Sequence, residues 1–216
     1  MKTRVAPKFH RETPAVRRES LVEATLRCLK MHGHEGVSIR KISAEAGVSI
    51  GLINHHFPSK SGLIAEAYAT LADTLQDSLL VQAKRPGANP RERLSGFIRA
   101  SFAPELIDPD LFHVWLVFWS MVRHSDEMRT VHDRTYDAQR RILESLLRDL
   151  TLTGGAPKFK LKQAAIALSA LLDGLWVELS LSSSTVKPAD AIALCEDWVD
   201  ALSGGHLPRL ASQEAR

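Results

Sequence analysis

Two groups of residues in this 216-residue chain have types and spacings that could do chemistry. The first is the run 49–56, SIGLINHH, in which small, amide and imidazole side chains stand among apolar ones. Such polar side chains hydrogen-bond to base edges and phosphates, and the run holds no acidic residue that would repel DNA. The run therefore indicates a surface that suits the major groove.

The second group combines tryptophan with one carboxylate. Trp115 and Trp119 are four residues apart, and Asp173 and Trp176 are three apart, so each pair shares one face of a helix. Ring faces and an anion together hold a cation that cannot donate hydrogen bonds, such as a quaternary ammonium, at roughly 0.5–2 kcal/mol per ring. The alternative is that the tryptophans are ordinary core and Asp173 is a satisfied interface residue.

Local signals in the stretch 37–60 predict two short helices joined by a tight turn. Ser38 can cap the first helix, because the first amides of a helix lack partners within it. Gly47 follows where the chain must leave in a left-handed conformation, and Ser49 then caps a second helix that Pro58 stops. Ser59 should cap the helix that comes next. The residues expected to be buried are Ile39, Ile42, Ala44, Ala46, Val48, Leu52, Ile53 and Phe57. The pattern is that of a helix-turn-helix DNA reader.

The rest of the chain also shows apolar residues at helical spacing, with breaks at proline and glycine. We expect an all-α fold of about nine helices and no sheet. Besides the two short ones, the expected helices span 16–32, 60–83, 91–103, 111–123, 126–150, 159–181 and 188–202. Residues 1–15 should form a mobile basic leader, and 205–216 a frayed tail.

Charge is distributed unevenly along the chain. Residues 1–60 hold 11 Lys/Arg against 5 Asp/Glu, a net +6, and the remainder holds 17 against 20, a net −3. A basic amino-terminal third fits a phosphate-binding module fused to a nearly neutral body. Charge alone would equally fit a solvated basic face.

Cys28 and Cys195 lie far apart on helical patterns, so we expect buried free thiols. No apolar run approaches the roughly 20 residues of a membrane span, and residues 1–18 lack the apolar core of a signal peptide. These features favour a cytoplasmic protein without a membrane partner.

Residues 17–64 resemble the DNA-binding domain of the TetR family of transcriptional regulators. The family's recognisable string, GVS-x-G-x-(I/L)-x-x-x-F-x-x-K, stands here as GVSIGLINHHFPSK at 47–60. Within the family the chain is similar to the BetI-like, choline-responsive repressors of glycine-betaine synthesis, through VWLVFWS at 114–120 and ALLDGLW at 170–176. The resemblance implies a DNA-binding domain over 16–62 and an effector-binding and dimerisation domain over 63–204.

The resemblance also implies positions of DNA contact: Ser38, Arg40, Lys41, Ser49, Ile50, Gly51, Leu52, Asn54, His55, His56 and Lys60. Three of them depart from the family's usual residues, since Asn54 and His56 replace a frequent Tyr and Ile50 a frequent Lys. Asparagine bonds bidentately to adenine, whereas isoleucine can touch only a thymine methyl. We therefore expect an adenine preference beneath Asn54.

For the second half, the resemblance implies repression released by choline or betaine aldehyde. The cage of Trp115, Trp119, Asp173 and Trp176 would fit this effector class. An apolar or aromatic ligand, as in repressors of efflux or catabolic genes, is the alternative. The last two helices should form a homodimer on a palindromic operator. The residues expected at that interface are Ala164, Ala167, Leu168, Leu171 and Leu175.

The sequence also bears on two other classes of function. An enzyme could pair Asp173 with His113, His124 or His132, but the sequence shows no nucleophile elbow, P-loop, dinucleotide fingerprint or metal-ligand spacing. A helical protein-interaction module is the other alternative. We expect no catalytic residue, cofactor or metal.

Overall fold

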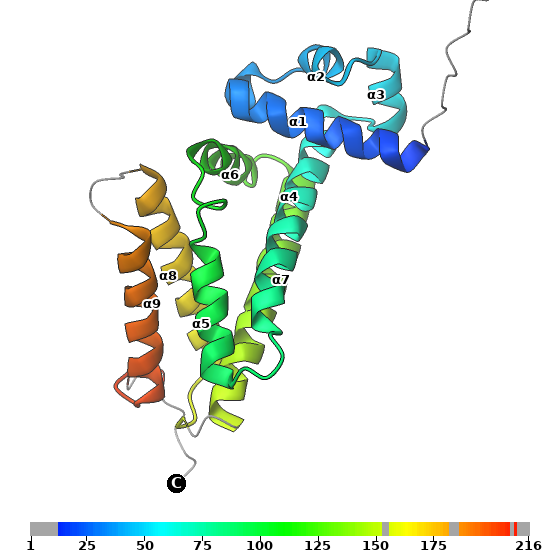
Figure 1. The fold of residues 1–216 in the computed structure, drawn as a ribbon. Helices are drawn as coiled ribbons and strands as arrows, with labels where there is room; N and C mark the ends of the chain where they lie inside the picture. Colours follow the sequence, from blue (N-terminus) through cyan, green and yellow to red (C-terminus); the bar gives the residue numbers. More distant parts are fainter. Residues whose placement is uncertain (1–12, 153–155, 182–185, 208–209, 211–216) are drawn as a thin grey trace, which may run out of the picture. The chain divides into compact units, whose positions relative to one another are not determined.

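The computed structural model describes residues 13–152, 156–181, 186–207 and 210, and nine helices account for most of them (Figure 1). In chain order the helices are α1 (Pro14–Gly36), α2 (Ile39–Ala46), α3 (Ile50–His56), α4 (Lys60–Ala83), α5 (Pro90–Ser101), α6 (Pro109–Met121), α7 (Asp126–Leu152), α8 (Leu161–Leu181) and α9 (Pro188–Ser203). Each expected helix is present with ends close to the expected ones. The all-α fold class is confirmed.

The two chain ends lie largely beyond what the structure covers. Of the expected mobile leader, residues 1–12 lie outside the described residues. Of the expected frayed tail, only 205–207 and 210 are described, and they are held by backbone hydrogen bonds. The His206 amide donates to the Ala201 carbonyl at 2.9 Å, and the Lys160 amide donates to the Leu210 carbonyl at 2.7 Å.

The chain divides into two compact units, residues 1–67 and 68–216, with the boundary inside α4. In the first unit, α1, α2, α3 and the start of α4 surround a core of fully buried side chains: Leu21, Leu29, Ile42, Ile53, Leu63 and Ile64. Cys28 is buried in this unit as a free thiol, as expected. The assignment of DNA reading to 16–62 and of effector binding to 63–204 stays a prediction.

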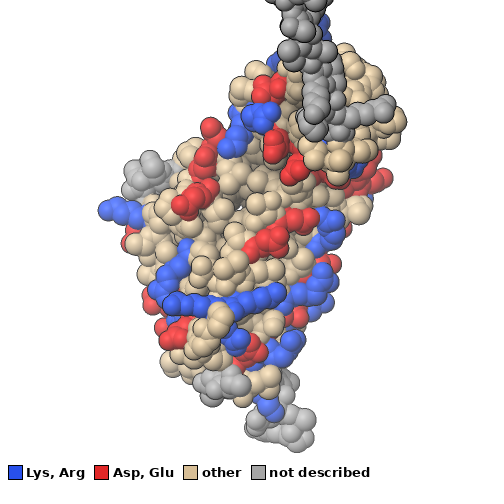
Figure 2. Space-filling model, turned by 45° about the vertical axis from the view of Figure 1, so that its right-hand side comes forward, with Lys and Arg blue, Asp and Glu red and all other residues tan. Residues whose placement is uncertain are grey.

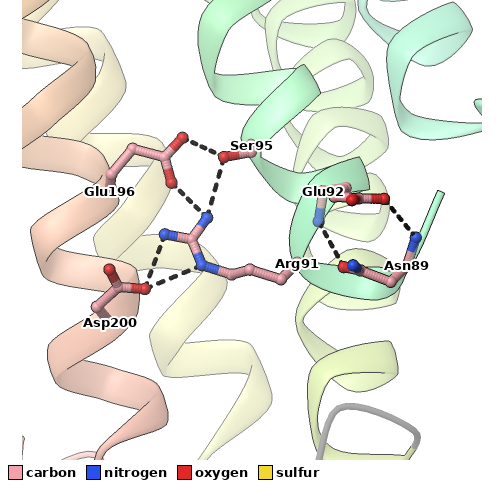
Figure 3. A network of polar contacts seen from close by, with 6 residues as sticks. All are labelled: Asn89, Arg91, Glu92, Ser95, Glu196 and Asp200. Carbon is pink, nitrogen blue, oxygen red and sulfur yellow. Dashed lines mark hydrogen bonds and ion pairs between the residues drawn. The ribbon is translucent and has the colours of Figure 1, made fainter.

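In the second unit, α5, α7, α8 and α9 pack against one another around a continuous apolar core (Figure 1). A polar network joins α5 to α9 at the edge of this core (Figure 3). The Arg91 guanidinium donates to Asp200 Oδ1 at 2.7 and 2.9 Å and also to Glu196, whose carboxylate accepts from Ser95 as well. Glu196 is mostly buried, so this network fixes α9 to α5 in one register.

Helix α8 is the most apolar long element in the described part of the chain. It has 21 residues and a mean hydropathy of 1.6 over its most apolar window, enough by length and composition to cross a bilayer. From the sequence we expected no uninterrupted apolar run of that length, and Lys162, Asp173 and Glu178 do interrupt α8. One such helix is weak evidence for a membrane, because core helices of soluble proteins meet the same test.

Only 39% of that window of α8 is buried. Three of the five residues expected at a dimer surface lie instead in the core of their own protomer: Ala164, Leu168 and Leu175. That expectation chose the wrong face, because α8 is apolar around most of its circumference and periodicity could not separate the two sides. The exposed face carries Ile166, Ala170, Gly174 and Leu181.

Figure 2 shows one face of the molecule, on which Lys and Arg side chains are interspersed with Asp and Glu. Ion pairs also link helices in the second unit. Arg93 of α5 contacts Asp149 of α7 at 2.7 Å, and Arg134 of α7 contacts Asp73 of α4 at 3.4 Å. A mixed surface of this kind suits solubility rather than binding to a polyanion.

Candidate DNA-reading and effector sites

Three serine caps fix the starts of the helices in the first unit. Ser38 Oγ accepts from the Lys41 amide at 3.2 Å, and Ser49 Oγ accepts from the Leu52 amide at 3.2 Å. Ser59 Oγ accepts from the Gly62 amide at 2.9 Å, ahead of α4. All three predicted caps are confirmed. Because each hydroxyl accepts these bonds, its own proton remains to donate to a phosphate oxygen.

The turn between α2 and α3 depends on one glycine. Gly47 has φ 64° and ψ 32°, the left-handed conformation, and its amide donates to the Ala44 carbonyl. The next amide, that of Val48, donates to the Ser43 carbonyl at 3.0 Å. These two bonds satisfy carbonyls that the end of α2 would otherwise leave unpaired. The left-handed exit predicted from the sequence is confirmed.

Helix α3 has one buried face and one exposed face, as a helix that enters the major groove requires. Ile53 is fully buried, and Phe57 just after the helix is 2% exposed. The expected contact residues that are exposed are Ser38, Arg40, Lys41, Ser49, Ile50, Gly51, Asn54 and His55; Leu52, His56 and Lys60 are partly buried. One packing expectation was wrong. Ala44 is exposed, because the short α2 buries only Ile42 fully and turns Ala44 outward.

Arg18 of α1 contacts the carboxy-terminal end of α3. The sequence alone did not predict this contact. The Arg18 guanidinium lies 4.2 Å from the centroid of the Phe57 ring, and its Nη1 donates to the His56 carbonyl at 3.0 Å. Its Nε also contacts Glu66 of α4 at 3.2 Å. The three partners are 38 or more residues away in the chain, so no local pattern indicated the contact.

A cavity of about 250 Å³ lies within the second unit. Its lining includes all four residues that the sequence proposed for an effector: Trp115, Trp119, Asp173 and Trp176. Helices α6 and α8 supply these four, and α4 and α7 close the cavity with residues that include Leu71, Leu75, Gln76, Thr135, Tyr136 and Gln139. The structure thus brings the proposed effector residues together at one cavity.

The tryptophans of the cavity present several ring faces at different angles. The ring centroids of Trp115 and Trp119 are 6.4 Å apart, and those of Trp115 and Trp176 are 6.5 Å apart at 83°. The Trp176 indole donates from Nε1 to the Leu106 carbonyl at 3.0 Å, which fixes its orientation. Phe112, on the same face of α6 as Trp115, packs edge-on against Trp176 at 5.2 Å.

Asp173 is the one charged side chain that lines the cavity within the described residues. Burial raises the pKa of its carboxyl to about 6, although a hydrogen bond from the Tyr136 hydroxyl and the positive charge of Arg140 oppose that rise. Burial and the nearby Asp173 also raise the pKa of Tyr136, which keeps this phenol protonated as a donor. The contact between Tyr136 and Asp173 forms only when α7 and α8 pack together, so the sequence alone did not indicate it.

Helix α4 is attached to α7 by polar contacts beside the cavity. The Tyr68 hydroxyl of α4 lies 3.1 Å from His132 Nδ1, and Gln76 Nε2 donates to the Thr135 carbonyl at 2.8 Å. The Thr135 side chain is 6% exposed, and its Oγ1 finds no hydrogen-bond partner within the described part of the chain. Since Thr135 lines the cavity, this hydroxyl is available to a polar ligand.

Comparison with known proteins decides the family. Residues 21–67 match the family model of bacterial regulatory proteins of the tetR family, and residues 90–204 match the carboxy-terminal domain of BetI-type transcriptional repressors. The chain belongs to the TetR family. Its second half is a BetI-type domain, and the protein is a DNA-binding transcriptional repressor, not an enzyme.

Curated relatives support the same conclusion over most of the chain. The HTH-type transcriptional regulator BetI of Rhizobium meliloti (strain 1021) is 34% identical over 86% of this chain and 89% of its own length. The BetI regulator of Burkholderia ambifaria (strain MC40-6) is 30% identical over 87% of this chain and 94% of its own length. Regulators of this family bind operator DNA as dimers and are typically cytoplasmic.

Two solved structures show the same fold. A protein from Pseudomonas aeruginosa PAO1, described as a transcriptional regulator, is 45% identical, with a TM-score of 0.86 over 94% of this chain and 98% of its own. A regulator from Saccharomonospora viridis, solved in complex with choline, is 24% identical, with a TM-score of 0.73 over 86% of this chain and 96% of its own. At 24% identity, the second likeness shows only that the two proteins share a fold.

Proposed function

We propose that this repressor binds a palindromic operator as a homodimer and is released by a small quaternary ammonium compound, such as choline or betaine aldehyde. The observation that carries the effector proposal is the position of Asp173 in a cavity walled by Trp115, Trp119 and Trp176. Asp173 is partly buried, and its raised pKa shows that Tyr136 and Arg140 do not fully compensate the desolvation of the carboxylate. A bound cation would supply the missing positive charge, and the rings would hold its methyl groups.

The size of the cavity supports a small effector. At about 250 Å³ it is below the roughly 300–1,000 Å³ typical of sites for drug-sized ligands. The alternative of an apolar drug-like ligand would need a larger space and would leave Asp173 buried without a charge partner. Choline also has a hydroxyl, and the unpartnered Thr135 Oγ1 offers it a hydrogen bond. The choline complex of the Saccharomonospora viridis regulator is consistent with this ligand class.

On the DNA side, we propose that α3 enters the major groove with Ser49, Ile50, Gly51, Asn54 and His55 facing the bases. Asn54 is exposed and can bond to adenine, and Ile50 is 45% exposed and can contact a thymine methyl. Leu52 belongs to the same groove-facing stretch, where its apolar side chain can make only van der Waals contact. The remaining proposed contacts position the helix on the sugar-phosphate backbone: Ser38, Arg40, Lys41, His56 and Lys60.

We propose that the dimer forms through the exposed faces of α8 and α9. On α8, Ala170 and Gly174 are four residues apart, and no atom lies within 4 Å of where a Cβ of Gly174 would stand. Small side chains at this spacing let two helices approach closely. Ile166 at 42% and Leu194 of α9 at 50% exposure supply apolar area beside them. Two α3 helices on one operator would then stand about 34–36 Å apart.

Effector binding would act on DNA through α4, the helix that begins at the DNA-reading unit and lines the cavity. Ligand contacts with Thr135 or Tyr136 would bear on the two hydrogen bonds that tie α4 to α7, those of Tyr68 and Gln76. A ligand shifts such an equilibrium only by its different affinity for the two positions of α4, typically about 1–3 kcal/mol.

The test is a titration of the purified dimer on the promoter DNA next to its own gene, at fixed salt, with choline, betaine aldehyde or no ligand. We expect specific binding that choline weakens by about 5–150-fold. The matched control is 3,3-dimethylbutan-1-ol, which has the shape of choline without its charge and should release no DNA. Equal release by this neutral alcohol would remove the cation cage and favour an apolar effector. Specific binding that none of these compounds alters would discard the effector class and keep the repressor.

A further inference from the structure

A second hollow, of about 420 Å³ and open to solvent, lies directly behind the effector cavity. Three residues line both spaces, so the two spaces are adjacent: Trp119, Tyr136 and Asp173. We call the second space the basic hollow, because Arg123, Arg140 and His132 also line it. Asp173 is the one acidic residue on its lining within the described chain.

Arg140 of α7 is the residue of the basic hollow whose hydrogen bonding is incomplete. Its Nε is buried and has no hydrogen-bond partner among the described residues. Its carboxylate neighbour Asp137 is one helical turn away at 3.9 Å, at the limit of an ion pair, and is itself largely exposed. The guanidinium lies 5.7 Å from the centroid of the Tyr136 ring, so it stands beside a residue that also lines the cavity. A guanidinium held in this way is suited to a carboxylate.

The two adjacent spaces differ in electrostatic character. The cavity offers aromatic rings and the Asp173 carboxylate, and the hollow adds two guanidinium groups from different segments of the chain beside that shared carboxylate. We propose that the basic hollow is an anion subsite, and that the effector preferred by this protein is a zwitterion in which a quaternary ammonium is linked to a carboxylate. The inference rests on the proposed cation cage and names the second half of the same ligand.

The proposal also predicts how affinity depends on the length of the linker between the ammonium and the carboxylate. With its ammonium against Asp173, a carboxylate on a one-carbon linker would stay close to the Asp173 carboxylate and be repelled by it. A linker of three carbons would let the carboxylate lie further from Asp173, on the side where Arg140 lines the hollow. Affinity should therefore rise with linker length from trimethylammonioacetate to 4-trimethylammoniobutyrate.

The experiment is calorimetric titration of the full-length protein with tetramethylammonium, trimethylammonioacetate and 4-trimethylammoniobutyrate. Arg140→Gln removes the proposed anion contact, and Arg123→Gln tests the second guanidinium. Arg141→Gln is the matched control, since Arg141 is exposed on the same helix and lines neither space. Sedimentation of each variant reports whether it still forms a dimer.

We expect Arg140→Gln to weaken 4-trimethylammoniobutyrate about tenfold while tetramethylammonium stays within about twofold. Arg123→Gln should give a smaller loss of the same kind, and Arg141→Gln should leave all three ligands within about twofold. An equal loss for the cation and the zwitterion in Arg140→Gln would overturn the anion subsite and leave the cation cage standing. If tetramethylammonium does not bind but the carboxylate ligands do so through Arg140, the cage fails and the subsite stands.

Two further outcomes would overturn the proposal. If no ligand binds the wild-type protein, both the cage and the subsite are excluded. If Arg140→Gln disrupts the dimer instead of changing ligand preference, the basic hollow is filled by a second copy of the chain. That second outcome has a physical basis, because Gly174 and Val177 of the exposed α8 face also line the hollow.

Discussion

The helix-turn-helix and the effector cavity are specified in different ways. In the helix-turn-helix, Ser38, Gly47 and Ser49 each act on neighbours within five residues, through caps and one left-handed turn. The cavity draws Gln76, Trp115, Tyr136 and Asp173 from four different helices. The first site is built by local backbone chemistry, and the second exists only when α4, α6, α7 and α8 are packed together.

This difference has an energetic side. The buried polar groups of the turn are satisfied by backbone partners, as in the bond from the Val48 amide to the Ser43 carbonyl. The cavity holds a buried carboxylate with a raised pKa and a buried hydroxyl, Thr135 Oγ1, that lacks a partner among the described residues. Such groups destabilise the empty protein and become favourable when a ligand satisfies them. Removal of a polar group from the turn should therefore destabilise the fold, whereas removal of a polar group from the cavity should stabilise the empty protein.

The largest expected effect follows from Asp173→Asn. The variant should bind choline at least about 100-fold more weakly, because a buried cation then lacks its anion. It should still bind operator DNA, but choline should no longer release it. At pH 7 the free energy of unfolding of the empty protein should rise by roughly 1–3 kcal/mol, since a carboxyl with a pKa of about 6 is ionised there at a cost. Choline titration checks the expected loss of affinity, and thermal melting checks the expected gain in stability. A loss of stability in the variant would contradict the claim that the ionised Asp173 destabilises the empty protein.

Asn54→Ala should produce the next largest effect, on the DNA side alone. Loss of a bidentate contact should remove roughly 1–3 kcal/mol of discrimination at one base position and leave choline affinity unaltered. Lys60→Ala is the control, because loss of a phosphate contact should weaken all sequences alike and lower the salt slope by about 1. Binding to a set of operators with single base changes separates the two patterns. A uniform loss for Asn54→Ala would exclude an adenine contact.

The same contrast explains which features of the two sites could be predicted from the sequence. The caps at Ser38, Ser49 and Ser59 and the left-handed Gly47 were predicted because each signal lies within a few residues of its effect. The cluster of three tryptophans with Asp173 was proposed from helical spacing, and packing placed all four at one cavity. Arg18 and Tyr136 were missed, since their partners lie on other helices. Arg140 was missed because the hollow that it lines forms only when α7 packs beside α6 and α8. Three residues predicted for a dimer face of α8 are buried in their own protomer, because apolar residues surround the helix.

The pH dependence of effector binding gives a further comparison. Only the ionised Asp173 attracts a cation, so choline affinity should be constant above about pH 7 and fall about tenfold for each unit below a pKa of about 6. Stability of the empty protein should move the other way. The folded carboxyl takes up a proton more readily than the unfolded one, so this group favours folding as pH falls from about 6 toward the unfolded value near 3.8. Calorimetry between pH 5 and 8 should show the trend in wild type and no such trend in Asp173→Asn.

The smallest expected effect concerns the hydroxyl of Thr135. Thr135→Val keeps the shape of the side chain and removes a hydroxyl that has no partner among the described residues, while the backbone carbonyl that accepts from Gln76 is untouched. Folding stability should therefore be unaltered or slightly higher. Choline affinity should fall by about 1 kcal/mol, or roughly fivefold, because its hydroxyl loses a buried acceptor. Tetramethylammonium, which has no hydroxyl, should bind wild type and variant equally. A loss shared by both ligands would mean that Thr135 shapes the cavity wall, and the choice of choline over other small ammonium ions would then rest on other residues.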